Sequence, residues 1–430
     1  MKTPTRLGLV LLLAVALGDA ALRVSSPSGV MPVAVVPHAA TELQACADYR
    51  VVREGLIPMP EGVPAAHASS LVAFPETHPL HAQKVVAAFW FAGTRESGAD
   101  VQIASSTFDQ ARQAWDAPQW VVNRHTVGKD LGIQIRRIGN PVAWADARGR
   151  LHLFVVATGL GGWAASRVVH LTEQAPMQFK VVRTLPLTAL VPAFNTSSLV
   201  RAVPLPLRDG GAVLPLYFEI GIKYGVAVRL SAEGEMQSIT RITQRREVLQ
   251  PTLVAHSPTH WSAFMRDYSP TERVAHSETF DAGVHWQDAG NLTLSNPGAS
   301  IAALRLSSGG LMLAHNPAGR GREVLLLSTS TNQPLSWTTR TLIDGAKADE
   351  YSYPTLIEVP QGPSAHTTVP DVWLSYTHMR KAIAFGALLL VAGHGAMAIE
   401  GAPATQVLTY QGAKYEFVVH GRADSREVKL

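Results

Sequence analysis

Arginines border apolar segments at two points of the chain, where they could bind an anion. Arg266 directly follows the apolar segment HWSAFM, and Arg320 and Arg322 come just before VLLLS. An arginine that ends a buried strand needs an anion or solvent, because an unpaired buried charge is costly. A guanidinium is a planar fork that binds a carboxylate through two hydrogen bonds. These arginines are therefore candidates for binding a ligand carboxylate. The structural alternatives are an ion pair between Arg266 and Asp267 and a solvated loop around the other two.

Two further segments carry groups that could take part in acid–base or nucleophilic chemistry. The loop FAGTRESGAD contains Arg95, Glu96 and Asp100, which could equally form a solvated hairpin with an internal salt bridge. The segment EYSYP contains Tyr351 and Tyr353, which we expect on the same side of a strand because they are two residues apart. A phenol with a pKa near 10 needs a base to react. Aromatic packing at a sheet edge is the structural alternative.

Other polar residues are weaker candidates. Asn140 begins a strand-like segment, Glu219 ends one, and Glu247 lies close to the start of the segment that contains Gln250. Three isolated histidines show no metal-ligand spacing: His152, His256 and His315. The sequence contains no phosphate-binding glycine loop, no nucleophile elbow and no dinucleotide-binding fingerprint. We therefore expect no metal and no cofactor.

The elements that must position these residues are short strands. From His67 onward, apolar segments of strand length recur in groups of four between turn residues, and the groups repeat every 45 to 55 residues or so, as in propeller blades. Six such groups predict an all-β fold, a six-bladed β-propeller of four-stranded antiparallel blades. The segment 49–56 could complete the last blade as an edge strand. The segment 381–393 fits a strand or a short buried helix, because a short apolar run does not distinguish them.

One turn has a recognisable pattern. Thr279 to Trp286, TFDAGVHW, fits the spacing Ser/Thr-x-Asp-x-Gly-x-x-Trp. The Asp can accept hydrogen bonds within its own turn, the Gly allows positive φ, and the Trp can anchor the turn to the sheet. An ordinary β-turn is the alternative interpretation. This turn resembles the Asp-box of the sialidase (neuraminidase) propellers, and the order of the other motifs between about His67 and Phe385 is similar to that family.

The resemblance implies roles for the candidate residues. It implies that Arg266 and Arg320 hold the carboxylate of an acidic sugar, with Arg322 as the rival of Arg320. It also implies that Asp100 is the general acid, that Tyr351 is the nucleophile, and that Arg95 contacts the substrate. Tyr353 remains a second tyrosine at the same site. A neutral phenol suits an anomeric carbon that bears a carboxylate, because an anionic nucleophile would be repelled.

Two positions depart from the sialidase pattern. The first arginine of the sialidases lies in an Arg-Ile-Pro motif, whereas this chain has His67, Ala68 and Ser69, and their basic glutamate is replaced by Gln250. A glutamine can orient the phenol but cannot accept its proton. The chain is more similar to bacterial predicted neuraminidases with His-Ala-Ser, Asn-Pro and Gln-Pro-Thr motifs, in which Asn140 starts the Asn-Pro step.

These departures leave two functional hypotheses. One is an exo-glycosidase acting on the terminal acidic sugar of a glycan, in which Glu219, or Glu247 behind it, supplies the missing base and His67 replaces the missing arginine. The other is a propeller that binds an acidic glycan or polysaccharide, or helps to process it, without hydrolysis. The first requires a carboxylate within hydrogen-bond reach of the reactive tyrosine.

Composition and the N-terminal residues predict the localisation of the protein. Lys2 and Arg6 precede an apolar run that ends at Gly18, which predicts a signal peptide over residues 1–20 and an exported protein, periplasmic or secreted. The run is short for a membrane anchor, the alternative interpretation. The propeller would then occupy residues 21–393 and a tail 394–430. Cys46 is the single cysteine, so no disulfide forms within the chain.

The charge of the chain does not favour a nucleic-acid partner. The formal net charge is +4 with a sequence pI of about 9.2, and most basic residues alternate with acidic ones. The densest basic group has no aromatic residues between its members, which favours a solvated face: Arg241, Arg245 and Arg246. We expect no nucleic-acid partner. The oligomeric state stays open.

Overall fold

The computed structural model describes residues 48–187, 197–331, 336–359 and 371–391, the isolated residues Ala14 and Ala34, and the backbone of 404–410 and 413–419. The chain forms two compact units, Met1–Val391 and Ala392–Leu430. In the second unit, β27 (Ala404–Tyr410) pairs with β28 (Ala413–Val419) as an antiparallel hairpin. Apart from Ala14, the expected signal peptide lies outside the described residues.

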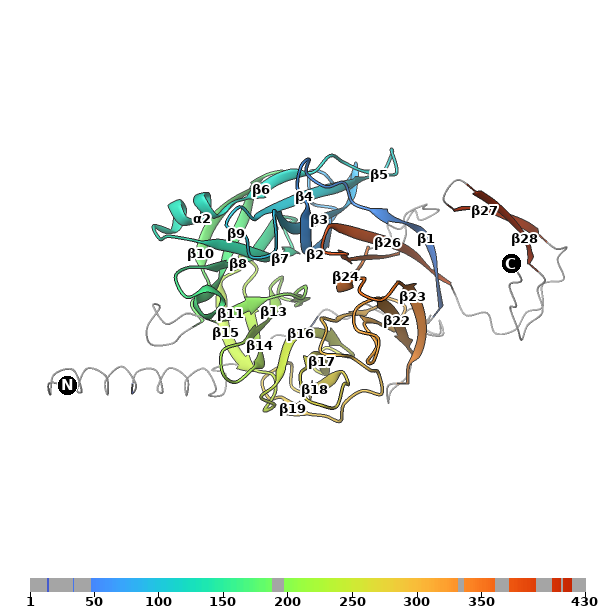
Figure 1. The fold of residues 1–430 in the computed structure, drawn as a ribbon. Coiled ribbons are helices and arrows are strands. Elements are labelled where there is room, and N and C mark those ends of the chain that lie inside the picture. The colour runs from blue at the N-terminus through green and yellow to red at the C-terminus, as the bar shows by residue number, and fades with distance from the viewer. Residues whose placement is uncertain are drawn as a thin grey trace. The chain divides into compact units, whose positions relative to one another are not determined.

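The first unit consists of six antiparallel sheets around a common axis (Figure 1). The innermost strands are β2 (Ala65–Ala73), β7 (Arg137–Ala145), β11 (Ser198–Val200), β16 (Val248–Ala255), β20 (Ala302–Arg305) and β24 (Tyr351–Glu358). The second strands are β3 (Lys84–Gly93), β8 (Leu151–Thr158), β13 (Ala212–Phe218), β17 (Trp261–Asp267), β21 (Leu311–His315) and β25 (Val372–His378). The predicted six-bladed β-propeller is confirmed.

The remaining strands complete the blades. The third strands are β4 (Gln102–Asp109), β9 (Ser166–Ala175), β14 (Tyr224–Leu230), β18 (Ala275–Thr279), β22 (Val324–Ser330) and β26 (Ala382–Val391). The outermost strands are β5 (Ala114–Trp115), β10 (Gln178–Thr184), β15 (Met236–Arg241), β19 (Gln287–Asp288), β23 (Thr338–Asp344) and β1 (Asp48–Leu56). The short strands β6 (Gln119–Val122) and β12 (Leu205–Pro206) pair with β4 and β13. Helix α2 (Arg124–Leu131) and a 3-10 turn, η1 (Gly162–Ala165), lie in the connections.

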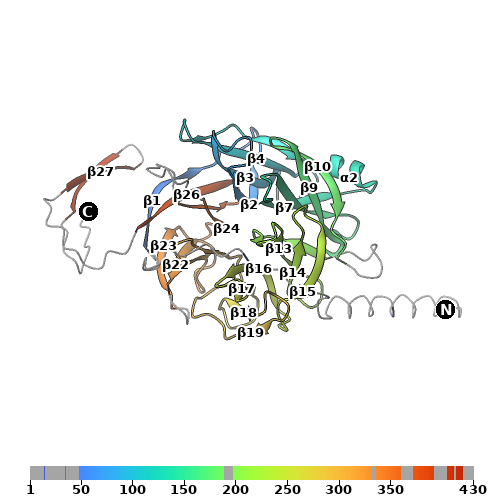
Figure 2. The same ribbon diagram turned by 180° about the vertical axis from the view of Figure 1, so that it is seen from behind.

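The ring is closed by the two ends of the propeller unit. β1 pairs with β26, so the first described strand is the outermost strand of the last blade (Figure 2). This confirms the prediction for residues 49–56, and the described part of the segment 381–393 forms a strand over Ala382–Val391. The seam between the last blade and the first is filled by an aromatic cluster of Trp90, Phe108, Trp115, Trp373 and Phe385. Apolar residues from facing blades pack in this way without any disulfide.

The Asp-box forms the hairpin turn between β18 and β19, as its residue types predict. The Thr279 hydroxyl donates to Asp281 at 2.8 Å, and Asp281 accepts the backbone N–H of His285 at 2.9 Å. Gly283 has φ 84°, and a Cβ atom there would lie 2.8 Å from the ring of Trp261. The turn therefore clamps two outer strands and packs on the core. It lies one strand beyond Arg266 along the chain, and it contributes no side chain to the site described below.

Each innermost strand begins beside a residue with positive φ. These residues are Ala68, Asn140, Ser197, Gln250, Gly298 and Tyr353, with φ between 43° and 65°. In four blades the pairing register shifts at this point, which marks a β-bulge. Left-handed backbone at a non-glycine residue costs on the order of 1 kcal/mol or more. The left-handed residue recurs in every blade, and in four of them it lies at a bulge that redirects side chains near the axis.

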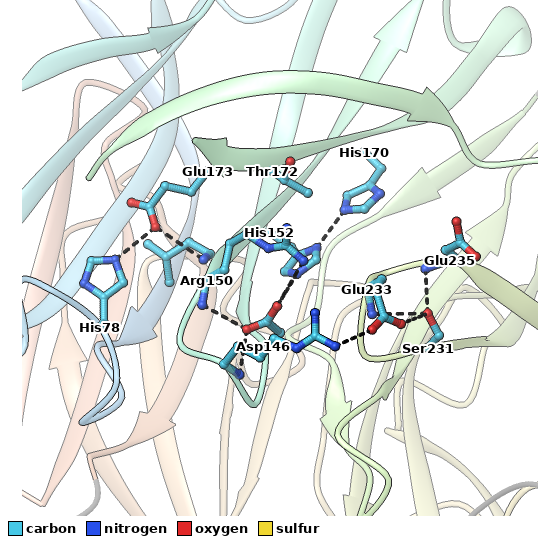
Figure 3. Close-up of polar contacts among 12 residues, drawn as sticks. His78, Asp146, Arg150, His152, His170, Thr172, Glu173, Ser231, Glu233 and Glu235 are labelled. Atoms are coloured by element: carbon cyan, nitrogen blue, oxygen red, sulfur yellow. Dashed lines mark hydrogen bonds and ion pairs between the residues drawn. The ribbon is translucent and has the colours of Figure 1, made fainter. Parts of the chain in front are cut away.

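A buried polar network lies at the ends of blades two and three that carry the β7–β8 and β14–β15 turns (Figure 3). Nε2 of His152 is 3.2 Å from Asp146 and its Nδ1 is 2.8 Å from Nε2 of His170. A carboxylate only accepts, so His152 donates to Asp146 through Nε2 and accepts from His170 through Nδ1. Nδ1 of His170 is then unprotonated, buried and without a partner among the described residues. Burial lowers the pKa of His170 to about 3.

This network predicts a loss of stability in mild acid. The unfolded chain protonates His170 near pH 6.5, while the folded chain resists protonation until about pH 3. The free energy of unfolding therefore falls as the pH drops below about 6.5, by up to about 1.4 kcal/mol per pH unit for one group. We expect His170→Gln to reduce the fall in Tm between pH 7.5 and 5.0, measured by calorimetry. The exposed His125→Gln is the control, and an unchanged pH slope in His170→Gln would contradict this account.

Candidate functional site

Tyr353 lies at the centre of a group of charged and aromatic side chains. We call this group the arginine cluster, and its members are Tyr353, His67, Glu96, Arg201, Gln250, Arg266, Tyr268, Arg322, Glu350 and Arg380. The positive φ of Tyr353 falls inside the β24 bulge, between Ser352 and Thr355. The ring centroid of Tyr353 is 4.2 Å from that of His67 in the first blade. The guanidinium carbons of Arg201 and Arg322 lie 5.3 and 5.8 Å from the centroid of the Tyr353 ring. Residues of blades one, three, five and six therefore meet at this tyrosine.

Glu350 organises one side of the cluster. It accepts hydrogen bonds from Arg380 at 2.5 Å, Arg322 at 3.1 Å and the Ser352 hydroxyl at 2.6 Å. Burial alone would raise the pKa of Glu350, but the bonds from Arg380 and Ser352 outweigh it and lower this pKa to about 2. Glu350 is thus ionised and shared between two arginines. One carboxylate does not neutralise two guanidinium groups.

Arg266 forms the other side of the cluster, at the end of β17. Its Nη1 donates to Gln250 at 3.4 Å, and its guanidinium carbon lies 4.5 Å from the centroid of the Tyr268 ring. Gln250 in turn donates to the hydroxyl of Tyr217 at 3.4 Å. Arg266 is 8% exposed, and its Nε is buried without a partner among the described residues. The side chain therefore has unused donors, and Asp267 does not pair with it but binds Ser269 instead.

Arg201 ties the third blade to the first and the last. It follows β11, is 3% exposed, and donates to the backbone oxygens of Ser69, Tyr353 and Pro354. Burial lowers the pKa of Arg201 to about 10, so the side chain stays charged at neutral pH. Its donors satisfy carbonyl groups that the bulges leave free. We therefore assign Arg201 a structural role beneath Tyr353.

His67 is buried and neutral. Burial, followed by the charge of Arg380, lowers the pKa of His67 to about 3. His67 therefore carries no charge at neutral pH, so in place of the missing arginine it offers a neutral imidazole and not a cation. Neither ring nitrogen of His67 has a hydrogen-bond partner among the described residues. Buried polar atoms usually have partners, so these nitrogens are unsatisfied within the described part of the chain.

A pocket of about 210 Å³ opens beside the cluster. It is lined by residues of the first and last blades and of the β3–β4 loop: Ala65, Ala66, His67, Phe91, Gly93, Thr94, Arg95, Glu96 and Arg380. Glu96 forms an ion pair with Arg380, so the acid of this loop that reaches the pocket is Glu96. Arg95 lines the same pocket and is exposed. The pocket therefore combines cationic and acidic groups at a solvent-accessible site.

Asp100 is occupied within its own loop. Its carboxylate accepts the backbone N–H of Thr94 at 2.7 Å and the Thr94 hydroxyl at 2.9 Å. The bond from the Thr94 N–H lowers the pKa of Asp100. A general acid at neutral pH needs a raised pKa. Asp100 therefore stabilises the turn that begins at Thr94.

Two sequence-based candidates lie away from the cluster, and in each case the residue two positions further along the chain reaches it. Tyr351 packs in the core with Tyr376, and its hydroxyl donates to Asp349 at 3.2 Å, so it does not share a side of the strand with Tyr353. The reason is the bulge, which breaks the two-residue alternation between them. Arg320 is exposed and pairs with Asp344 at 2.8 Å, whereas Arg322 reaches the cluster.

The remaining candidates lie around the cluster. Gln250 is within it, as described above. Glu219 follows β13 and is only half-buried, and its charge contributes to raising the pKa values of Tyr217 and Tyr268, after burial. Glu219 is therefore near the cluster, although no hydrogen bond joins its carboxylate to a tyrosine among the described residues. Asn140 lies at the bulge of β7, buried and with φ 43°.

Sequence reasoning missed Arg201, Glu350 and Arg380. Arg201 and Arg380 each follow a strand-like segment, the same signal that identified Arg266. Arg380 lies in the tight turn between β25 and β26, where its φ is 53° and its backbone oxygen accepts from Ala66 of the first blade. Ala66 and Arg380 are far apart in the sequence, so no local sequence pattern predicts this contact. Arg380 thus brings a cation to the place where His67 supplies none.

Comparisons with known proteins identify the family. Residues 84–366 match the BNR repeat-like domain. The chain belongs to the BNR repeat-like family. No curated protein matches it. Its fold is similar to that of the Hadza microbial sialidase Hz136, with 14% identity, a TM-score of 0.59, and coverage of 76% of this chain and 66% of that one. The chain therefore spans slightly less than two thirds of that sialidase.

Other solved structures share the fold. A protein of unknown function from Dyadobacter fermentans has a TM-score of 0.61 at 10% identity, with coverage of 80% of this chain and 99% of that one. The leech intramolecular trans-sialidase has a TM-score of 0.50 at 11% identity, with coverage of 82% and 69%. The predicted sialidase-type propeller is thus confirmed at the level of fold and family. No helix within the described residues is long and apolar enough to cross a membrane.

The geometry around Glu350 predicts a specific loss of stability. We expect Glu350→Gln to lower the free energy of unfolding by about 2 kcal/mol, because two partly exposed guanidinium groups lose the anion that they share. The loss should be present in full above pH 4.5 and fade as the pH falls towards 2, since the folded-state pKa of Glu350 is the lower one. Urea denaturation measures it. The exposed pair partner Asp344→Asn should cost less than about 0.5 kcal/mol, and equal effects would contradict the account.

Proposed function

We propose that this protein binds the terminal acidic sugar of a glycan at the arginine cluster and hydrolyses its glycosidic bond, as an exported sialidase-like exo-glycosidase. One observation carries the proposal: Arg322 lies over the Tyr353 ring and shares Glu350 with Arg380, and Arg266 lies over the nearby Tyr268 ring. The only carboxylate partners of these three arginines within the described residues are Glu350 and, for Arg380, Glu96. With Arg201 included, the cluster contains four cations and two anions. A ligand carboxylate would offset part of the remaining positive charge.

The proposed roles follow from position. Arg266, which lies over the Tyr268 ring, and Arg322, which lies over the Tyr353 ring, hold the sugar carboxylate. Arg380 takes the place of the arginine that the sialidase pattern puts at His67. Tyr353, rather than Tyr351, presents its phenol to the anomeric carbon, because it is the tyrosine that meets the arginines.

The acid and the export signal complete the proposal. Glu96 lines the pocket and would protonate the leaving oxygen once the sugar carboxylate competes for Arg380. Asp100 supports the loop that carries Glu96. The basic and apolar residues of the first 20 positions support export to the periplasm or outside the cell.

A second candidate function is binding without hydrolysis. No carboxylate of the described residues is hydrogen-bonded to Tyr353, and Gln250 cannot accept the phenol proton. A nucleophilic phenol needs such a base. In this case, the cluster would recognise the acidic end of an exported polysaccharide and leave its linkage intact.

Kinetics on fluorogenic α-sialosides and uronides test the hydrolase directly. We expect Tyr353→Phe to lower kcat by about 100-fold or more, as for the loss of a reacting group. Tyr351→Phe should leave kcat within about twofold, because its hydroxyl bonds only to Asp349 among the described residues. Arg266→Gln should lower kcat/KM by about 30-fold through the loss of a charged hydrogen bond.

Two results would contradict this assignment. If Tyr351→Phe were inactive and Tyr353→Phe active, the choice of phenol would be wrong. If the wild type bound sialic acid or a uronic acid by calorimetry but turned over none of the fluorogenic substrates, the second function would hold.

A further inference from the structure

A second group of arginines surrounds another pocket. Arg124, Arg136 and Arg137 line a pocket of about 280 Å³ together with Ala99 and Gln134. The three arginines lie within fourteen residues of sequence, in the connection between the first and second blades. None of the residues assigned a role in the arginine cluster lines this pocket. The function proposed above does not account for it.

The segment that carries these arginines is held in place by a helix cap and by buried apolar residues. Asn123 caps helix α2 by accepting the backbone N–H groups of His125 and Thr126, each at 3.0 Å. Val127 of the helix and Ile135 after it are buried in the core between the first two blades. Arg124 begins the helix, and its Nη1 reaches the backbone oxygen of Ile135 at 3.4 Å. The arginines thus stand on a fixed support.

Arg136 and Arg137 are held by the second blade. The backbone N–H of Arg136 donates to Thr158 at 2.8 Å, and Arg137 is the first residue of β7. The Nε atom of Arg137 is buried and has no hydrogen-bond partner among the described residues. A buried donor normally has an acceptor. The pocket therefore offers a desolvated guanidinium donor as well as exposed ones.

No carboxylate neutralises this group. Within the described residues, no salt bridge involves any of the three arginines, whereas four other partly exposed arginines each pair with an acid: Arg112, Arg148, Arg183 and Arg229. Three guanidinium groups around one pocket repel one another unless an anion lies between them. Planar guanidinium forks suit a carboxylate or a sulfate. The pocket therefore has the chemistry of an anion site.

One loop borders both pockets. In the loop 94–100, Arg95 and Glu96 line the pocket beside the arginine cluster, and Ala99 lines the second pocket. We propose that Arg124, Arg136 and Arg137 form a second anionic subsite, which binds a carboxylate or sulfate on a later unit of the glycan whose acidic end occupies the arginine cluster. This inference depends on the proposed function in one respect: the arginine cluster is taken as the first subsite, which binds the acidic end of the glycan. The substrate is therefore a polyanionic chain rather than a glycan with one acidic end.

Affinity against chain length tests the second subsite. Calorimetry at constant salt compares sialic acid and galacturonic acid with their trimers, and adds a heparin-derived hexasaccharide as a sulfated probe. We expect Arg136→Gln/Arg137→Gln to weaken the best oligomer by about tenfold and to leave its monomer unchanged. Arg208→Gln, an exposed arginine in the turn before β13, is the matched control and should change neither affinity.

The outcomes separate the two subsites. An oligomer affinity that the double variant leaves unchanged, an equal loss for monomer and oligomer, or no binding of any probe by the wild type would overturn the second subsite. If oligomers bound through Arg136 and Arg137 while Arg266→Gln changed no affinity, the second subsite would stand and the proposed function would fail. Weaker binding of sulfated and carboxylated oligomers to the same extent would assign the pocket to anionic groups in general.

Discussion

The left-handed residue at the start of each innermost strand is the constraint on which the site depends. A regular strand alternates its side chains between two blades and would point few of them at the axis. The bulges at Asn140, Gln250 and Tyr353 break this alternation, and a proline follows each of them. Because proline has no N–H, the interrupted ladder loses no donor there. Contacts elsewhere offset the backbone strain. Among them, Arg201 donates hydrogen bonds to the backbone oxygens of Ser69 and Pro354, beside the bulges of the first and last blades.

Charge is the second determinant of the site. Arg201 has its donors on backbone oxygens, and Arg322 and Arg380 share Glu350. Among the described residues, the Arg266 guanidinium contacts the amide oxygen of Gln250 and the Tyr268 ring, and no carboxylate pairs with it. The cluster keeps a net positive charge in the folded protein. This charge favours binding of an anion over binding of a neutral sugar. An excess of positive charge is also present at the second pocket beside the loop 94–100, where Arg124, Arg136 and Arg137 lie. The two pockets together therefore favour a glycan with repeated negative charges.

The sequence predicts the fold well and the site only in part. Alternating apolar segments and the Asp-box are local signals, and they lead to the six blades and the register of the fourth. The site depends on contacts between blades, such as Arg380 beside His67, that no local pattern contains. The sequence does not show that Tyr353, and not Tyr351, lies at the arginines, because a regular strand would place both on one side and the chain has a bulge there. Spacing alone does not tell which of the neighbouring Arg320 and Arg322 turns inward.

A crystal structure with 2-deoxy-2,3-didehydro-N-acetylneuraminic acid, a planar analogue of the sialidase transition state, tests the central claim most directly. The account predicts that the carboxylate of this compound lies within hydrogen-bond distance of Arg266 and Arg322, with its ring over Tyr353. Arg380 should then bind the ligand in place of Glu96. A ligand seated with its carboxylate away from these arginines, or no ligand at Tyr353 at saturating concentration, would contradict the account.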